Sequence, residues 1–305
     1  MSMLLVNNTD ISEKITVSSC IHEMYVGGRS DSLTIRVYDP DCQFDKWKIK
    51  TGAPIEFKDS GTASGKMELY SAAPESGDYI LRAYSMPVSG TVPRTKPWER
   101  VHFAQIGEEI AKRHGLEFEA YGLDDVVYQY RAQENETDFK FFGRLCKLER
   151  AALTIYDGRL IASYEPYLES IEPATTIDTV GCVVECEDNS ILEYGAAKVS
   201  CGPYSGMFKG TDDNGRIWVP EKPIVCQSDA EAIRFAAAEL REKNKMLISG
   251  SIEGSLMPQY APGIMVNIIN RQAPSWSGNY FIYKIRHDYG KRRTKIFFRK
   301  RLEGY

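Results

Sequence analysis

Residues 133–145 read QENETDFKFFGRL, and this stretch decides how the chain is interpreted. Thr137 and Asp138 are of the residue types that begin helices, because their side-chain oxygens accept hydrogen bonds from unpaired backbone N–H groups. Apolar residues then recur at helical spacing. The stretch predicts a short amphipathic helix that buries Phe141, Phe142, Leu145 and Leu148 and leaves Lys140, Arg144 and Lys147 in water. By itself this pattern also fits any small αβ unit with a capped helix.

A hairpin is predicted directly after this helix. Asp157 and Gly158 are a two-residue signal for a type I′ turn, and they separate predicted strands at 152–156 and 160–164. A helix followed by a hairpin is typical of a small α/β unit. We expect residues 93–168 to form an α/β insertion domain.

The N-terminal side of the motif predicts another helix. It follows a proline-rich joint at 87–97, and its apolar face is Phe103, Ile106 and Ile110. Gly115 ends it, because glycine adopts the left-handed conformation of a helix cap without steric cost. A strand is predicted at 116–120.

The first 92 residues have the pattern of β structure. Residues 32–38 alternate, with Leu33, Ile35 and Val37 on one face. Further short strands are predicted at 55–58, 66–72 and 79–84, with Gly- and Ser-rich turns between them. Such spacing is typical of a sandwich or barrel, and residues 1–92 are expected to form a first tube-like β-barrel.

Residues 169–305 predict a second tube-like β-barrel that includes one helix. Ser228 and Glu231 form a capping-box signal for a surface helix at about 228–246, with Ala230, Ile233, Ala237 and Leu240 on its packed face and a Glu239–Lys243 pair in water. A loop is expected at 203–223. Strands are predicted at 180–185, 191–194, 196–201, 246–252, 264–270, 279–287 and 294–300.

Two blocks of the chain resemble each other. Residues 52–82 and 261–299 both have the order turn, strand, loop, glycine, strand, loop, strand. Each block has a tyrosine at the fifth position after the loop glycine: Tyr70 after Gly65, and Tyr283 after Gly278. Two interpretations stay open, a duplicated barrel and the chance similarity of two β meanders.

Composition is typical of a globular protein made in a cytoplasm. The 305 residues are 43% hydrophobic and 26% charged, with net charge −4, and mean hydropathy is −0.36. There is no run of about 20 apolar residues, and the N-terminus lacks the basic segment of a signal peptide. A pI near 5.7 argues against tight nucleic-acid binding.

The sequence offers no catalytic or metal-binding motif. The seven cysteines are never spaced Cys-x-x-Cys, so we expect reduced core thiols and no zinc site at Cys182 and Cys186. The four histidines have no metal-binding spacing, and His287 is expected to make a structural hydrogen bond. The basic run at 291–293 fits a solvated turn or a contact with an acidic partner protein.

The motif order points to one family. Gln-x-x-Glu-Thr-Asp-x-x-Phe-x-x-Arg-Leu at 133–145, followed by Asp-Gly-x-Leu at 157–160, resembles the late-control D-type baseplate hub proteins of contractile phage tails. Trp98 with its following helix, the Ala-rich helix at 230–244 and the block GNYFIYKIRH at 278–287 extend the resemblance over most of the chain. The family often has a glycine near 150–152, where this chain has none, so the exact end of the helix that begins in the 133–145 motif stays open.

The resemblance implies a mainly β fold with two tube-like β-barrels and a small α/β domain. It implies a homotrimeric ring that joins a sixfold tail tube to a threefold central spike, because a duplicated barrel answers that symmetry mismatch. The implied partners are further copies of the chain, the spike protein, the tail tube protein, and other baseplate and tape-measure proteins. No membrane, cofactor or enzyme activity is implied, and nucleic acid enters only as passing cargo. The alternative function is a tail-associated enzyme that degrades peptidoglycan.

The same resemblance implies a place and a channel. The protein would be made in a host bacterial cytoplasm and assembled into the baseplate of a virion or tail-like particle. Acidic residues on barrel strands, with Glu56, Glu68, Glu185 and Glu187 as candidates, are expected to face the channel, because basic residues would retain phosphate groups. The basic residues at 286–301 are expected to face neighbouring subunits.

Overall fold

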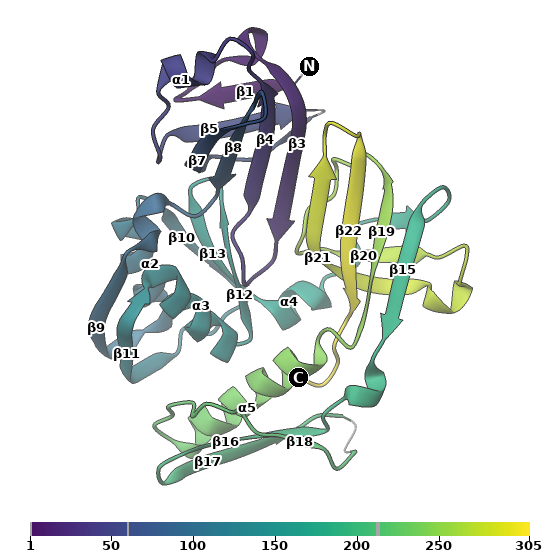
Figure 1. The fold of residues 1–305 in the computed structure, drawn as a ribbon. Helices are drawn as coiled ribbons and strands as arrows, with labels where there is room; N and C mark the ends of the chain where they lie inside the picture. The colour runs from purple at the N-terminus through teal and green to yellow at the C-terminus, as the bar shows by residue number, and fades with distance from the viewer. Residues whose placement is uncertain (1, 60, 212–213) are drawn as a thin grey trace.

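The computed structural model describes residues 2–59, 61–211 and 214–305 (Figure 1). The chain is mainly β, with 47% of residues in strands and 21% in helices. Within the described residues, no helix is long and apolar enough to cross a membrane.

The largest sheet in the described part of the chain has 14 strands. Its N-terminal part consists of β1 (Met3–Val6), β2 (Thr9–Asp10), β3 (Thr16–Tyr25), β4 (Ser32–Tyr38), β5 (Pro54–Asp59), β6 (Thr62–Ala63), β7 (Met67–Glu75) and β8 (Asp78–Tyr84). Its C-terminal part consists of β14 (Thr176–Asp178), β15 (Val183–Asp188), β19 (Ile248–Ser255), β20 (Met265–Ile269), β21 (Gly278–Asp288) and β22 (Arg293–Lys300). Antiparallel pairing of β3 with β21 joins the two parts.

The two parts of this sheet have the same strand order. The N-terminal part runs β3-β4-β8-β7-β5, and the C-terminal part runs β15-β19-β22-β21-β20. Both have a bulge at the equivalent place, and the extra residue is Tyr70 in β7 and Tyr283 in β21. The similar blocks in the sequence therefore have matching topology. The described strands do not close into a barrel by hydrogen bonding.

Alternation of side chains gives the large sheet one apolar face. Leu33, Ile35 and Val37 are all at most 1% exposed, as their spacing predicts. A directly opposed row continues that face from strand to strand: Thr294, His287, His22, Leu33, Ala83 and Leu69, all at most 1% exposed. The two core clusters of the sheet meet at His22 and His287.

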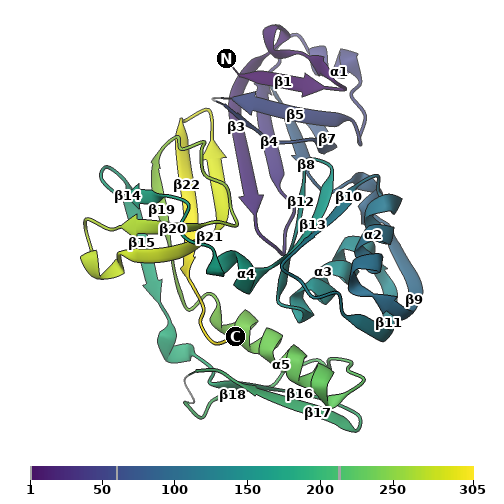
Figure 2. The same cartoon turned by 180° about the vertical axis from the view of Figure 1, so that it is seen from behind.

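A second unit lies beside the large sheet (Figures 1 and 2). A two-stranded sheet pairs β9 (Pro93–His102) with β11 (Val127–Thr137), and a three-stranded sheet has the order β10 (Glu117–Tyr121), β13 (Arg159–Tyr164), β12 (Ala151–Tyr156). The helices are α2 (Phe103–Arg113), α3 (Asp138–Leu148) and α4 (Glu165–Ser170). Strand β9 corrects the expected joint at 87–97, because its prolines lie in a sheet of only two strands, where missing N–H groups cost little.

The helix and hairpin predicted from the motif are confirmed. Thr137 caps α3 by accepting from the Lys140 N–H, and Phe141, Phe142 and Leu145 are fully buried. Asp157 and Gly158 both have positive φ, as a type I′ turn requires. Arg150 adopts φ +57 directly after α3, the conformation for which glycine is favoured. The segment between α3 and β12 therefore has an arginine in the left-handed conformation, at the place where the sequence left the helix end open.

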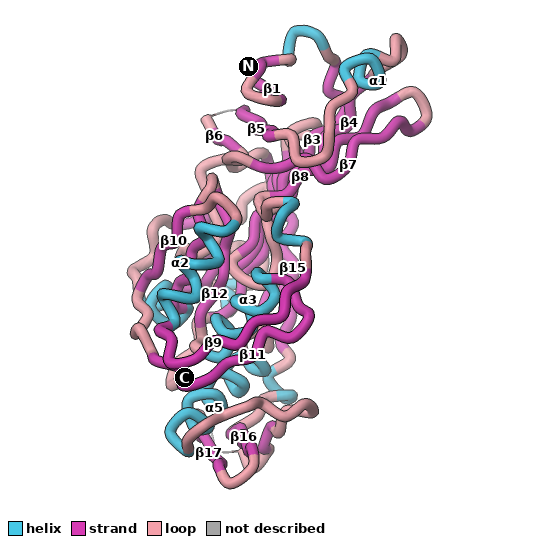
Figure 3. The backbone as a smooth tube through the Cα atoms, turned by 90° about the vertical axis from the view of Figure 1, so that its left-hand side faces the viewer, coloured by secondary structure: helices cyan, strands magenta, loops and turns pink. Residues whose placement is uncertain are grey.

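Helix α5 (Asp229–Asn244) packs on a third sheet, at the end of the molecule opposite α1 (Gln43–Trp47) and β1 (Figure 3). That sheet has the order β17 (Tyr204–Lys209), β16 (Ala196–Cys201), β18 (Ile217–Trp218). Short 3-10 helices are η1 (Ser12–Lys14), η2 (Val88–Thr91), η3 (Ser190–Leu192) and η4 (Pro274–Trp276).

Three predictions in this region are wrong in whole or in part. The strand expected at 191–194 is η3 and coil, because the Asp188 carboxylate accepts from the Ser190 N–H and ends the strand in a turn. Strands β17 and β18 lie within the loop expected at 203–223, of which residues 212–213 lie outside the described residues. The predicted face of α5 is only half right: Ala237 and Leu240 are buried as expected, but Ala230 and Ile233 are exposed, and Ala232, Phe235 and Ala236 are buried instead.

Helix α5 is also more buried than a surface helix. Ser228 caps it as predicted, by accepting from the Glu231 N–H at 3.1 Å. The Glu231 carboxylate accepts from the Gln227 N–H instead of the Ser228 N–H that a capping box requires. Glu239 pairs with Lys147 at 3.5 Å and accepts from the Trp218 ring N–H, and Lys243 lies over the Trp218 ring. These contacts replace the expected pair between Glu239 and Lys243.

Candidate functional site

One face of the large sheet is polar from β15 to β5. A row of directly opposite residues crosses it: Val183, Glu253, Lys295, Arg286, Glu23, Ser32, Tyr84, Glu68 and Pro54. Opposite residues on paired strands point to the same side of a sheet. None of these residues is buried. We call this surface the polar face, and it is the reverse of the apolar face described above.

The four glutamates predicted from the sequence all lie on the polar face. Side chains two residues apart share one side of a strand. Glu68 belongs to the row itself, Glu56 is two residues from Pro54, and Glu185 and Glu187 are two and four residues from Val183. The register therefore places on one surface residues that lie more than a hundred positions apart in the chain.

Cations share this face with the acids. Lys284 lies 2.9 Å from Glu23, Lys295 lies 2.9 Å from Glu185, and Arg293 lies 3.6 Å from Glu253. Arg286, in the row itself, lies 3.9 Å from Glu23. The hydrogen bond from Lys295 lowers the pKa of Glu185. Basic residues of the C-terminal part therefore share the polar face with the acids, because β21 and β22 alternate and present every second residue to it. That the basic residues at 286–301 face neighbouring subunits stays a prediction.

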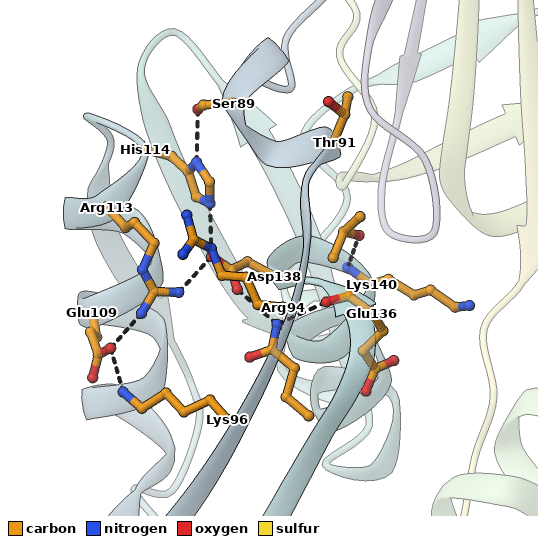
Figure 4. Close-up of polar contacts among 12 residues, drawn as sticks. Ser89, Thr91, Arg94, Lys96, Glu109, Arg113, His114, Glu136, Asp138 and Lys140 are labelled. Carbon is orange, nitrogen blue, oxygen red and sulfur yellow. Dashed lines mark hydrogen bonds and ion pairs between the residues drawn. The ribbon is translucent and has the colours of Figure 1, made fainter.

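The sequence motif itself builds a buried polar cluster around Asp138 (Figure 4). Gln133 donates to Oδ1 of Asp138 at 2.8 Å, Arg113 donates to Oδ2 at 2.6 Å, and Nε2 of His114 lies 2.9 Å from Oδ2. Burial alone would raise the pKa of Asp138, but the hydrogen bonds from these three side chains outweigh it and lower the pKa. His114 also contacts Ser89 of η2 at 2.8 Å. The motif residues thus act in structure, where they connect α2, α3 and η2.

A second ion cluster joins α4, α5 and β22. Arg241 and Arg299 are each 1% exposed, and both pair with Glu165 and Glu169. Lys245 lies 3.3 Å from Glu165. Burial would raise the pKa of Glu165, yet the neighbouring cations lower it. This cluster was not predicted, because the spacing of charges in a sequence does not reveal their long-range partners.

Candidate acid–base groups are few. Asp31, which is 4% exposed, lines a cavity of about 420 Å³ with Tyr25, Tyr121 and Tyr156, and burial raises its pKa to about 7. His287 accepts from or donates to Thr294 at 2.8 Å, which confirms the structural hydrogen bond. Across the described ranges, no group of three or more His, Cys, Asp or Glu side chains could hold a metal ion.

Comparisons with known proteins bear on the fold. No protein-family model and no curated protein sequence matches the chain. Its structure is similar to a tail protein from Neisseria meningitidis MC58, with TM-score 0.75, 12% identity and coverage of 98% of this chain and 96% of that one. It is also similar to the 43 kDa tail protein of prophage MuSo2 from Shewanella oneidensis, with TM-score 0.75, 12% identity and coverage of 98% of both chains.

A third similar structure comes from a secretion system. The E. coli c3393 protein, a component of the type VI secretion system, matches with TM-score 0.64 and 10% identity over 99% of this chain and 78% of that one. It is itself described as similar to the T4 bacteriophage tail proteins gp27 and gp5. At these identities the comparisons show a shared fold. The chain has the fold of phage tail proteins and of a type VI secretion component.

Proposed function

We propose that this chain is a baseplate hub subunit of a contractile tail or tail-like injection particle, of the late-control D type. Three copies form a ring, and the ring joins the sixfold tail tube to the threefold central spike. In this proposal residues 1–92 and 169–305 are two tube-like modules and residues 93–168 are an insertion. The fold shared with tail proteins supports this function over other roles for a mainly β chain.

The observation that carries the proposal is how the two halves of the sheet join. The edge strand of the first half, β3, pairs with residues 284–288 of β21 in the second half. The equivalent edges are β15 and residues 71–75 of β7. Among the described residues, β15 pairs only with β19, and 71–75 pair only with β8.

The open edge at β15 of one copy of the chain fits the open edge at β7 of a second copy. If β15 of one subunit pairs with β7 of the next, the joint inside each chain is repeated between chains. Three chains with two modules each then give six similar positions around an axis, which matches a sixfold tube above and a threefold spike below. Ring closure also covers edge strands that natural proteins rarely leave open.

The polar face fits the lining of such a ring. Its lysines and arginines lie beside carboxylates, as with Lys284 and Glu23 or Lys295 and Glu185. A cation that already has a carboxylate partner offers a weaker contact to a phosphate group, because the carboxylate repels the phosphate. A nucleic-acid or protein cargo would therefore slide past this surface.

The peptidoglycan-degrading alternative has less support. Glycoside hydrolysis uses two carboxyl groups on either side of the bond that is cleaved. Asp31 has the raised pKa of a general acid, but among the described residues lining its cavity it is the only carboxylate.

Two measurements test the function. The mass of the purified protein, alone and with its spike protein, should reach that of three copies in at least one of the two samples. A density map of the particle should place three copies on the tail axis between tube and spike. Six copies in the ring, or a position at the tail periphery, would overturn the proposal, and cell-wall hydrolysis in a zymogram would favour the enzyme.

A further inference from the structure

Two cysteines meet where α5 begins. Cys201 is the last residue of β16, on the same side of that strand as Ala197 and Val199, which are buried in the cluster that contains α5. Cys226 lies three residues before α5 and is 3% exposed. Both cysteines pack in this one apolar cluster, where the end of the β16–β17 hairpin lies against the start of α5, and Cys201 is the neighbouring group that most raises the pKa of the Cys226 thiol. All seven cysteines are free in the structure.

The backbone on both sides of this pair is fixed. The Ser205 N–H donates to the Asp229 carboxylate at 2.8 Å, which ties β17 to the first residue of α5. Gly206 lies so close to α5 that a Cβ there would approach the Ile233 nitrogen to 2.3 Å. The two thiols therefore stay close to each other as long as α5 is packed on its sheet.

We propose that Cys201 and Cys226 are an oxidation site that forms a disulfide when the protein meets a peroxide. Cys201 is partly exposed, so its thiol reacts first. One peroxide molecule converts it to a sulfenic acid and leaves as water, and the Cys226 thiol then displaces the sulfenic oxygen as a second water molecule. Two thiols are oxidised, one peroxide is reduced, and one S–S bond forms.

The order of these steps follows from the environments of the two sulfurs. Burial and the neighbouring Cys201 raise the pKa of Cys226 to about 11, so this thiol is a poor first nucleophile at neutral pH. The bond would fasten the start of α5 to the end of β16. That link would hold the layer of α5 and β16–β18 in place once the particle leaves a reducing cytoplasm.

Peptide mapping of the folded, full-length protein tests the proposal. After treatment with hydrogen peroxide and alkylation of remaining thiols, trypsin should release peptide 199–209 joined to peptide 217–234, and reduction should separate them. The thermal midpoint should rise by about 5 °C on oxidation and fall back on reduction. Cys226→Ser should abolish the joined peptides and the shift.

Cys42→Ser is the matched control, because Cys42 is exposed directly before α1, and it should change neither result. If both peptides are recovered fully alkylated from oxidised protein, or if Cys201 is found joined to a different cysteine, the proposal is wrong. Mapping of the unsubstituted protein decides the matter even if Cys226→Ser does not fold.

Discussion

The carboxylate of Asp138 holds three segments together. It accepts from Gln133 on β11 and Arg113 on α2, and it contacts His114 at the end of α2. Its side chain is 1% exposed, so the loss of its charge would weaken the buried hydrogen bonds that it makes with Gln133, Arg113 and His114.

Asp138→Asn should therefore destabilise the protein by roughly 3 kcal/mol, measured by urea unfolding. Glu134→Gln is the control, because Glu134 is exposed in the same motif, and it should change stability by less than about 0.5 kcal/mol. Equal stability of the two variants would mean that the buried cluster does not contribute to folding.

Sequence alone predicts only part of this cluster. The cap at Thr137 and the stripe at Phe141 and Phe142 depend on neighbours within four residues, so local spacing reveals them. Arg113 and His114 lie about 25 positions from Asp138, and nothing in their spacing selects that partner. The motif was useful as a family signature, while its physical role became visible only in the fold.

At the scale of elements, packing against other elements overrides local patterns. Strand β17 was missed because Gly206 interrupts its alternation, yet that glycine is what lets the strand touch α5. The buried side of α5 was predicted only in part, because the helix contacts a sheet on one side and buried ion pairs elsewhere, which no single apolar stripe describes.

Gly206→Ala should destabilise the protein by about 2 kcal/mol or more, because the new Cβ would meet helix backbone that cannot move aside. Gly143→Ala is the matched control. Gly143 lies inside α3, where a Cβ would meet only Leu153 at 3.7 Å. That variant should gain about 0.5–1 kcal/mol from helix propensity. Opposite signs in thermal unfolding would confirm both contacts.

Folding stability should decrease in acid because of two histidines where β3 pairs with β21. Burial, together with the neighbouring His287, lowers the pKa of His22 to about 3, and burial lowers the pKa of His287 to about 4. Above pH 6.5 both residues are neutral in folded and unfolded protein, so stability is fully present. As pH falls below 6.5 the unfolded chain binds protons that the folded chain does not, and stability should fall by roughly 1.4 kcal/mol per pH unit for each histidine.

Urea midpoints measured from pH 7 to pH 4 should show this loss. His22→Gln with His287→Gln should flatten the profile in that window, since glutamine does not titrate. His102→Gln is the control, because His102 is exposed and lies outside the joint. A profile that stays equally steep in the double variant would assign the acid sensitivity to other groups.

At the scale of the whole molecule, the duplicated strand order makes the unpaired edges specific. Ala73 is the third residue after the bulge residue Tyr70 in β7, and Arg286 is the third residue after the bulge residue Tyr283 in β21. The two positions are therefore equivalent. By the same register Glu187 occupies in β15 the place of Glu23 in β3. Arg286 lies directly opposite Glu23 inside the chain, so Ala73 should lie opposite Glu187 between chains.

A charged side chain introduced at position 73 should therefore control ring formation. Ala73→Glu would place a carboxylate against an edge that already carries Glu185, Glu187 and Asp188, and it should weaken the trimer. Ala73→Arg would recreate between subunits the pair that Arg286 and Glu23 make within one, and it should strengthen the trimer, most clearly at low salt. Ala73 is exposed, so both variants should unfold as the parent does. Sedimentation of both, with the spike protein present, measures the effect, and identical masses and salt dependence would place the subunit contact elsewhere.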